Sequence, residues 1–175
     1  MTTRKPAAPV LPPKKASALV LVVGIAAAAV LSPFVSGWED GPKGPALVPY
    51  RDIVGVWTQC SGETLNVTAT SPRETPEGCA IKLDKRLAGF AQGVVKRNPQ
   101  LRGRDNQWAA MTSLAYNIGV QGYAGSTVAR RIDAGQWRAA CDAMLMWNKA
   151  GGRKVQGLVN RRNAERALCL KGVSA

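Results

Sequence analysis

The chain has 175 residues, 46% of them hydrophobic, which suits one compact domain with a tail and is too little for two full-sized domains. The net charge of +13 favours contact with polyanions such as nucleic acid, anionic lipid or an acidic cell wall, without choosing among them. The sequence has no histidine, which excludes Ser-His-Asp catalysis, Cys-His catalysis and zinc sites with histidine ligands.

The N-terminal region has the layout of a membrane segment. Residues 1–15 contain four prolines and four cations and predict a short disordered tail. An uncharged run of 22 residues, 16–37, follows and is long enough to span a hydrocarbon core of about 30 Å. Because basic flanks stay in the cytoplasm, we expect a cytoplasmic N-terminus and a periplasmic location for everything after Gly37.

The run 16–37 is only weakly apolar, since half of its residues are Ala, Gly or Ser and Pro33 interrupts its last turn. Three interpretations remain open: a cleaved signal peptide, a permanent anchor, and a segment that inserts and later leaves the membrane. We favour the third interpretation, because a marginal transfer energy makes exit from the bilayer possible.

Beyond this run the sequence changes to short apolar segments with turn residues. Residues 49–64 place Val, Ile, Trp and Thr among glycines and predict short strands joined by tight turns. Helices are predicted for 75–95, 107–119, 126–135, 136–152 and 157–172, the first of them with Thr75 as N-cap. This order predicts an α+β fold with a small β-containing lobe and a larger all-helical lobe.

Several blocks of this region resemble the phage-type lysozymes, the muramidases of glycoside hydrolase family 24. They are "YRDIVGVWT" at 50–58, "SLAYNIG" at 113–119, "STVARRI" at 126–132 and "GLVNRRNAER" at 157–166. The similarity is to the signal-anchor-release endolysins of tailed phages in particular. It implies a lysozyme-like fold, with residues 1–15 as a cytoplasmic tail, 16–37 as the signal-anchor-release segment and 38–175 as the muramidase domain.

The resemblance also implies three catalytic residues. The family pattern is a Glu, an Asp and a Thr six residues after that Asp, and Glu39, Asp52 and Thr58 match it. Glu39 and Asp52 are thirteen positions apart, where the family usually has about nine, so Asp40 is an alternative acid. We keep Glu39, because Trp38 precedes it as an aromatic residue precedes the family's Glu.

The chemistry of glycoside hydrolysis agrees with these roles. The reaction needs one protonated and one ionised carboxyl group beside the scissile bond. Desolvation favours the protonated form of a Glu that ends an apolar segment beside Trp38, whereas an Asp on a polar strand stays ionised. The hydroxyl of Thr58 is expected to hold the attacking water. Without the family pattern, the two acids would more simply be solvated groups next to a membrane.

Other conspicuous residues receive structural interpretations. The tryptophans at 108, 137 and 147 are predicted to be core or lobe-interface residues, and residues 150–152 a turn. Tyr116 and Asn117 lie in a block that borders the cleft in the family, and a structural role is favoured for both. Three arginines of the last predicted helix are expected to form a solvated cationic face: Arg161, Arg162 and Arg166.

Four cysteines, none in a C-x-x-C pair, argue against a thiolate zinc site and fit two disulfides in an oxidising compartment. Three connectivities are possible, and we predict Cys60–Cys79 and Cys141–Cys169. The first would tie the strands to the helix that starts near residue 75, and the second would tie helices at the end of the larger lobe. No cysteine precedes Cys60, so restraint by a cysteine in the membrane segment, which some relatives use, is excluded.

The functional prediction is a lysozyme that hydrolyses the β-1,4 bond between N-acetylmuramic acid and N-acetylglucosamine in peptidoglycan and causes host cell lysis, without a cofactor or metal. Its expected partners are peptidoglycan and, through residues 16–37, the host inner membrane, from which it is released to the periplasm. We expect a monomer that does not bind nucleic acid. The alternative is a basic, membrane-tethered module that binds cell wall or nucleic acid without catalysis, whose effect would survive replacement of Glu39.

Overall fold

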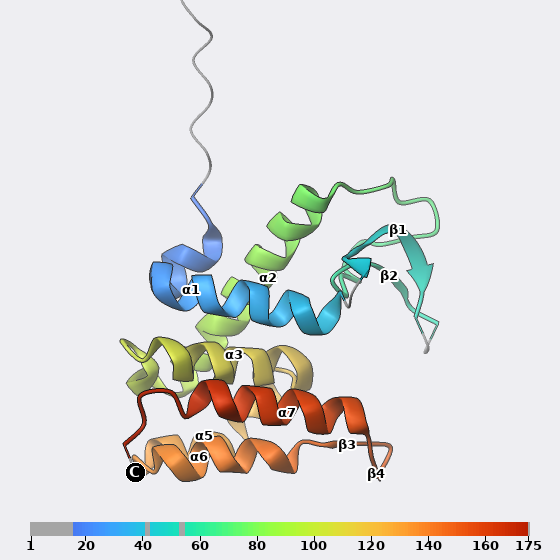
Figure 1. The fold of residues 1–175 in the computed structure, drawn as a ribbon. Coiled ribbons are helices and arrows are strands. Elements are labelled where there is room, and N and C mark those ends of the chain that lie inside the picture. Colours follow the sequence, from blue (N-terminus) through green and yellow to red (C-terminus); the bar gives the residue numbers. More distant parts are fainter. Residues whose placement is uncertain (1–15, 41–42, 53–54, 175) are drawn as a thin grey trace, which may run out of the picture.

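The computed structural model describes residues 16–40, 43–52 and 55–174 (Figure 1). The elements in chain order are α1 Ala18–Glu39, β1 Ala46–Arg51, β2 Trp57–Cys60, α2 Pro76–Arg97, η2 Pro99–Leu101, α3 Asp105–Ile118, α4 Val120–Ala124, α5 Thr127–Asp133, α6 Trp137–Ala143, η3 Met144–Met146, β3 Lys149–Ala150, β4 Arg153–Lys154 and α7 Gln156–Cys169. A β1–β2 lobe beside a larger stack of helices confirms the predicted α+β class. The predicted tail, residues 1–15, lies outside the described residues.

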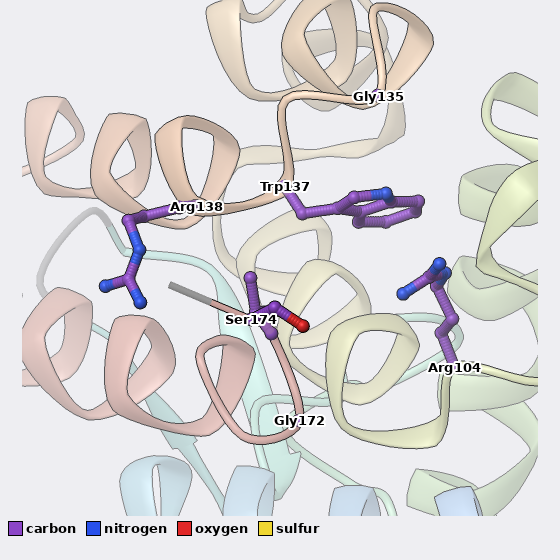
Figure 2. Close-up of a pocket in the computed structure, with 7 residues that line it drawn as sticks. Arg104, Gly135, Trp137, Arg138, Gly172 and Ser174 are labelled. Atoms are coloured by element: carbon purple, nitrogen blue, oxygen red, sulfur yellow. The ribbon is translucent and has the colours of Figure 1, made fainter.

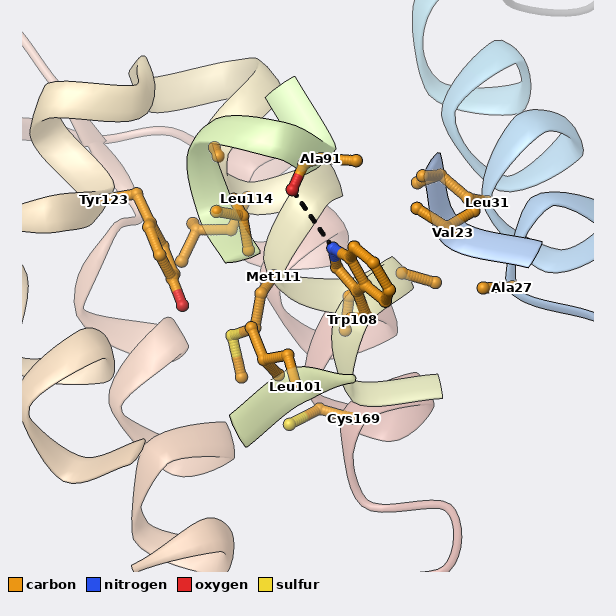
Figure 3. Close-up of a cluster of buried hydrophobic side chains, with 14 of the residues drawn as sticks. Val23, Ala27, Leu31, Ala91, Leu101, Trp108, Met111, Leu114, Tyr123 and Cys169 are labelled. Atoms are coloured by element: carbon orange, nitrogen blue, oxygen red, sulfur yellow. Dashed lines mark hydrogen bonds between the residues drawn. The ribbon is translucent and has the colours of Figure 1, made fainter. Parts of the chain in front are cut away.

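Helix α1 contains most of the apolar run and packs against α2 and α3. By length and composition it is able to cross a membrane, with a mean hydropathy of 2.5. In this structure one of its faces instead contributes to the core. Figure 3 shows this face directed toward Trp108. The buried side chains of α1 are Leu19, Val23, Ala27, Ala28, Leu31 and Val35.

The apolar helix is broken at Gly24, where φ is 83° and ψ is 169°. This combination lies in a region that essentially only glycine occupies. The arm before the break is anchored to α2 by Asp84, whose Oδ2 accepts hydrogen bonds from the backbone N–H groups of Ala18 (2.7 Å) and Leu19 (3.3 Å). The hydroxyl of Ser17 donates to the other carboxylate oxygen of Asp84. The docked segment is therefore two helical pieces.

The core of the helical lobe is centred on α3. Trp108 is buried there, and its Nε1 donates to the carbonyl oxygen of Ala91 at 3.2 Å (Figure 3), which confirms its predicted core position. Tyr123 is also fully buried, and its hydroxyl donates to Oδ1 of Asn98 at 2.6 Å. Trp137 and Trp147 are partly buried and pack against the edge of this core.

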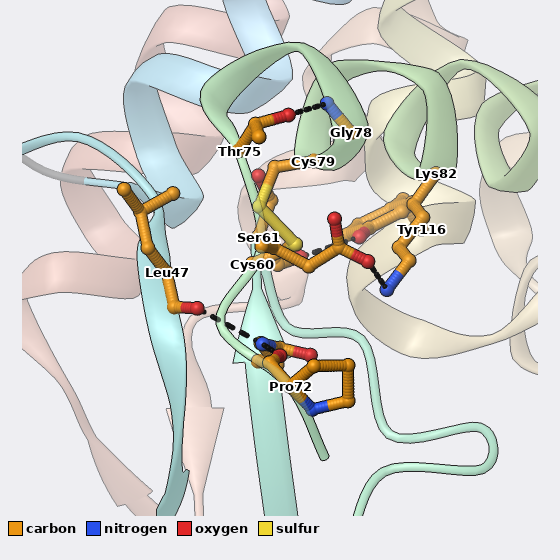
Figure 4. The surroundings of a disulfide bond; sticks show 11 residues. Leu47, Cys60, Ser61, Pro72, Thr75, Gly78, Cys79, Lys82 and Tyr116 are labelled. Atoms are coloured by element: carbon orange, nitrogen blue, oxygen red, sulfur yellow. Dashed lines mark hydrogen bonds and ion pairs between the residues drawn. A yellow bond between two sulfur atoms is a disulfide. The ribbon is translucent and has the colours of Figure 1, made fainter.

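Both predicted disulfides are present. Cys60 bonds to Cys79, with 5.1 Å between the Cα atoms, and ties the end of β2 to the first turn of α2 (Figure 4). Cys141 bonds to Cys169, with 5.6 Å between the Cα atoms, and ties α6 to the end of α7. Each bridge therefore joins elements that are separated in the chain.

Two sequence-based expectations are wrong. Residues 136–152 do not form one helix, because α6 ends at Ala143 and β3 pairs with β4 in an antiparallel hairpin. Gly151 and Gly152, both with positive φ, form the turn of that hairpin, and this agrees with the turn predicted at residues 150–152. Arg161 and Arg162 are not a solvated face, since they are only 6% and 0% exposed. They are buried because both pair with a buried carboxylate of their own helix.

Candidate active site

Two of the three predicted catalytic residues lie on the β1–β2 hairpin. Tyr50 of β1 pairs with Thr58 of β2, and Asp52 directly follows β1. Asp52 Oδ1 accepts a hydrogen bond from the N–H of Val56 at 2.8 Å. The hydroxyl of Thr58 donates to the carbonyl oxygen of Val56 at 3.1 Å, and Thr58 is 4% exposed. The carboxylate and the hydroxyl are thus both held by Val56, at the tip of the hairpin.

Glu39 comes from a different part of the molecule, since it is the last residue of α1. Its Oε1 lies 2.7 Å from Nη1 of Arg161 on α7, and its side chain is 22% exposed. The expected apolar surroundings are therefore wrong: Trp38 is 36% exposed, and a guanidinium group faces the acid instead. A Cβ added to Gly62 would lie 3.8 Å from Glu39 Oε2, so the chain after β2 borders the other carboxylate oxygen.

A buried ionic network lies behind Arg161. Glu165 Oε1 accepts hydrogen bonds from the Ser113 hydroxyl (2.7 Å), Nη2 of Arg162 (2.8 Å) and Nε of Arg161 (3.2 Å). Burial raises the pKa of Glu165 and lowers the pKa of Arg162, while their mutual attraction opposes both shifts. Arg161 thus bridges the surface carboxylate Glu39 and the buried carboxylate Glu165.

Residues 60–62, which we call the acid-facing turn, connect the hairpin to Glu39. Gln59 and Glu63 exchange backbone hydrogen bonds of 2.9 and 2.8 Å across this turn. Tyr116 of α3 donates its hydroxyl to the carbonyl oxygen of Ser61 at 2.9 Å (Figure 4). Burial raises the pKa of Tyr116 to about 12, so the hydroxyl keeps its proton at neutral pH. Asn117, beside Tyr116, accepts a hydrogen bond from Nη1 of Arg162 at 3.1 Å.

The sequence did not predict Arg161 as a neighbour of the acid. The spacing of Arg161 and Glu165, four positions apart on a predicted helix with opposite charges, indicates an ion pair within that helix but not the contact with Glu39. Asp40, the alternative acid, is the C-cap of α1, and its N–H donates to the carbonyl oxygen of Ser36 at 2.8 Å. Glu39, rather than Asp40, makes the ion pair with Arg161.

A separate pocket of about 250 Å³ opens in the helical lobe (Figure 2). Arg104 lies over the ring of Trp137 there, 4.1 Å from its centroid. None of the three predicted catalytic residues lines this pocket, and its lining residues include no acid. They are Arg104, Gly135, Trp137, Arg138, Gly172, Val173 and Ser174. Among the described residues, this pocket therefore offers no carboxyl group for chemistry that needs a pair of them.

Comparison with solved structures defines the class of fold. The structure is similar to the active form of P1 phage endolysin Lyz, with 25% identity and a TM-score of 0.69, covering 90% of this chain and 93% of that chain. It is also similar to the endolysin from Escherichia coli O157:H7 phage FAHEc1, with 28% identity and a TM-score of 0.70, covering 82% and 92% respectively. The fold is lysozyme-like, as the sequence predicted.

Sequence comparison then gives the family. The Phage lysozyme family model matches residues 42–165. The SAR-endolysin of Enterobacteria phage P21 is 36% identical over 166 residues, which cover 93% of this chain and 99% of that protein. The chain belongs to the phage lysozyme family.

Proposed function

We propose that the protein is a muramidase that hydrolyses the β-1,4 bond between N-acetylmuramic acid and N-acetylglucosamine in peptidoglycan and thereby lyses the host cell. Membership in the phage lysozyme family supports this activity. The observation that carries the proposal is the position of the Glu39 carboxyl group, against the turn that follows the hairpin with Asp52 and Thr58. The family resemblance implies which bond is cleaved and which roles these residues have.

In the proposed reaction, Glu39 gives its proton to the glycosidic oxygen as the bond breaks. Arg161, 2.7 Å from Oε1, stabilises the carboxylate that this transfer leaves behind. The Asp52 carboxylate stabilises the positive charge that develops on the sugar. Because the Thr58 proton is donated to Val56, the lone pairs of its oxygen are available to accept a hydrogen bond from the attacking water. As the water oxygen bonds to the anomeric carbon, the proton that it loses passes to the Asp52 carboxylate. The family resemblance implies inversion at the anomeric carbon.

The test is replacement of the acid by its neutral isostere. Glu39→Gln keeps the shape of the side chain and should leave the fold intact while lowering turnover by about 10²- to 10⁴-fold, since proton donation is lost. Turbidity loss of chloroform-treated Gram-negative cells and release of reducing ends from purified peptidoglycan measure this effect. Asp52→Asn and Thr58→Ala should each lower turnover as well.

Asp40→Asn is the matched control, and we expect it to keep most of the activity. Full activity in Glu39→Gln together with loss in Asp40→Asn would transfer the acid role to Asp40. A nuclear magnetic resonance time course in which the first product retains the anomeric configuration would contradict inversion. Lysis of cells by Glu39→Gln at the rate of the parent would favour the non-catalytic binding module.

We also propose that residues 16–37 act as a signal-anchor-release segment. Relatives at 36% and 34% identity are named SAR-endolysins, and α1 has the length and hydropathy of a membrane span. Glu39 ends α1, so insertion of α1 holds the acid at the membrane surface, away from the hairpin. Leu19 and Leu31 cannot face lipid and fill the core at the same time. Release therefore assembles the site.

Fractionation of cells before and after an uncoupler tests the release proposal. The full-length protein should move from the membrane fraction to the soluble periplasmic fraction, with its mass unchanged. A soluble product that has lost about the first thirty residues would replace release by cleavage of a signal peptide. A protein that stays in the membrane fraction after the uncoupler would indicate a permanent anchor.

A further inference from the structure

We propose that Arg86 and Tyr116 are positioning residues, which hold the acid-facing turn against Glu39 and so fix the β1–β2 hairpin relative to the acid. The inference rests on the proposed muramidase function and adds two residues that do not themselves donate a proton, carry the charge or hold the water. Both act through the backbone of the turn.

Such positioning is needed because the catalytic groups come from two parts of the molecule. Glu39 ends a helix of the helical lobe, whereas Asp52 and Thr58 lie on the hairpin. Their relative placement depends on the contacts that join the hairpin to the helices. A misplacement of about 1 Å between reacting groups can lower a rate by about 10²-fold.

The acid-facing turn is built for close approach to Glu39. Its first residue, Cys60, has a φ of 53°, and Gly62 has a φ of 80°, a value that a side chain disfavours. The exchange of backbone hydrogen bonds between Gln59 and Glu63 makes the turn a direct continuation of β2. A displacement of the turn is therefore transmitted to the strand that carries the Thr58 hydroxyl.

Two helices hold consecutive carbonyl groups of this turn. Arg86 of α2 donates from Nη1 to the carbonyl oxygen of Gly62, and Tyr116 of α3 donates to that of Ser61 at 2.9 Å. The two side chains also contact each other, since Cζ of Arg86 lies 5.2 Å from the centroid of the Tyr116 ring. Phe90 packs on the same ring at 5.1 Å between centroids. We call Arg86 and Tyr116, with their two hydrogen bonds to the turn, the clamp.

The disulfide Cys60–Cys79 is a further tie between the turn and α2, but it acts at one end only. It fixes the last residue of β2 and does not itself hold the carbonyl groups of Ser61 and Gly62. The two hydrogen bonds of the clamp hold these carbonyl groups, at the point where the backbone faces the Glu39 carboxyl group.

The competing explanation for an effect at Arg86 is its charge, because peptidoglycan is anionic. Lys85 is adjacent to it on α2 and is exposed, so Lys85→Met removes the same charge without touching the clamp. Arg86→Met keeps the apolar stem, and Tyr116→Phe keeps the ring that contacts Phe90 while removing only the hydroxyl. These three variants separate positioning from attraction.

The experiment measures kcat and KM of the full-length, released protein on purified peptidoglycan. Arg86→Met and Tyr116→Phe should each lower kcat by about tenfold and change KM by less than about twofold, because the turn moves relative to the acid. Arg86→Lys should recover part of kcat, since an ammonium group supplies one donor. Lys85→Met should leave kcat unchanged. A rise in KM in Arg86→Met, equal to that in Lys85→Met and without loss of kcat, would overturn the proposal.

Amide hydrogen exchange of residues 61–63 gives a second readout that does not depend on turnover. Faster exchange there in Tyr116→Phe, with an unchanged melting temperature, supports the clamp, and exchange equal to the parent overturns it. If the parent protein itself does not cleave peptidoglycan, the proposed function fails, and the exchange result still decides whether the turn is held as inferred.

Discussion

The two oxygens of the Glu39 carboxyl group meet different surroundings. Oε1 lies against the guanidinium group of Arg161, and Oε2 faces the backbone at Gly62. Arg161 is in turn fixed by Glu165 through its Nε, at 3.2 Å. A planar guanidinium group can hold two carboxylates in a defined geometry, so the orientation of the acid depends on a charge buried behind it.

Loss of this guanidinium group should be costly for stability. Arg161→Met leaves the buried Glu165 with one cation fewer, and we expect the free energy of unfolding to fall by about 3–5 kcal/mol, as when one partner of a buried ion pair is removed. Urea unfolding followed by circular dichroism measures the change. Turnover of the remaining folded protein should fall as well, because Glu39 loses its partner.

Lys82→Met provides the comparison for the loss of stability in Arg161→Met. Lys82 pairs with Glu74 near the surface, where an ion pair contributes about 0–1 kcal/mol. An Arg161→Met variant that is destabilised no more than Lys82→Met would show that the buried network contributes no more to stability than an ion pair near the surface.

The sequence predicted the candidate acid, the second carboxylate and the hydroxyl, but not their neighbours. The spacing of Asp52 and Thr58 is local, and both side chains bond to Val56 between them, so a pattern along the chain is able to specify it. The pair Arg161–Glu39 spans 122 positions. Its formation depends on the packing of both α1 and α7 against α3, which no local pattern contains.

At the level of elements, α1 has a backbone suited to two environments. In a bilayer, every backbone N–H and carbonyl group must be hydrogen-bonded within the segment, which requires a continuous helix. In the docked structure the helix is broken at Gly24, and Asp84 satisfies the N–H groups of Ala18 and Leu19 at its start. Under the proposed release, Gly24 is the position at which one helix becomes two.

Gly24→Ala should therefore shift the balance toward the inserted form. Alanine is strained by about 1–3 kcal/mol in the docked backbone and favours a continuous helix by about 1 kcal/mol. The added methyl group meets no atom within 4 Å, so the effect comes from the backbone and not from a clash. After an uncoupler, we expect a smaller soluble fraction and later lysis than for the parent.

Gly37→Ala is the matched control, because it adds the same methyl group to the same apolar run. Gly37 lies in the helical part of α1, is exposed and has open space around its Cα. Its replacement should leave release unchanged. Equal release of the two variants would show that the backbone break at Gly24 does not affect release.

Element boundaries were predicted best where a cap defines them. Thr75 accepts a hydrogen bond from the N–H of Gly78 at 2.9 Å, and α2 starts at the following residue, as predicted. The β3–β4 hairpin was missed because strands of two residues carry almost no alternating pattern. Gly151 and Gly152 were taken as the end of a helix, although their positive φ angles serve a hairpin turn.

At the level of the whole molecule, the two disulfides hold different parts of the fold. Cys60–Cys79 holds the acid-facing turn, and Cys141–Cys169 holds the end of the helix that carries Arg161. The cysteines of the two bridges are 19 and 28 positions apart in the sequence. Closing a loop of this length in the unfolded chain should stabilise the folded protein by about 3 kcal/mol for each bridge. We expect removal of either bridge by Cys→Ser pairs to lower the melting temperature by a similar amount.

The two variants should differ in turnover below their melting temperatures. Loss of Cys60–Cys79 should lower kcat, because the hairpin is less well fixed, whereas loss of Cys141–Cys169, remote from the turn, should leave kcat close to that of the parent. Steady-state kinetics at a temperature where both variants are folded decides this. Equal kcat values in the two variants would contradict the assignment.

The class of fold was predicted from the order of elements and from the family blocks, but the helices that α1 packs against were not. Its apolar run was interpreted as a membrane segment that packs on the domain after release, and in the structure α1 packs against α2 and α3. Hydropathy does not separate a helix that faces lipid from one that faces a protein core, since both environments select the same residues.

Under the proposed release, the residues of α1 face lipid first and the protein core afterwards, and the two environments favour different side chains. Leu21 and Ile25 favour lipid and are 76% and 78% exposed once the helix is docked, so they contribute nothing to the core. Ala27 and Ala28 are small enough to pack closely against the domain and add little to membrane affinity. A substitution that improves one state tends to weaken the other, which narrows the sequences that this helix can accept. A chain shortened to begin at Trp38 would also lack one wall of its core and the helix that carries its acid.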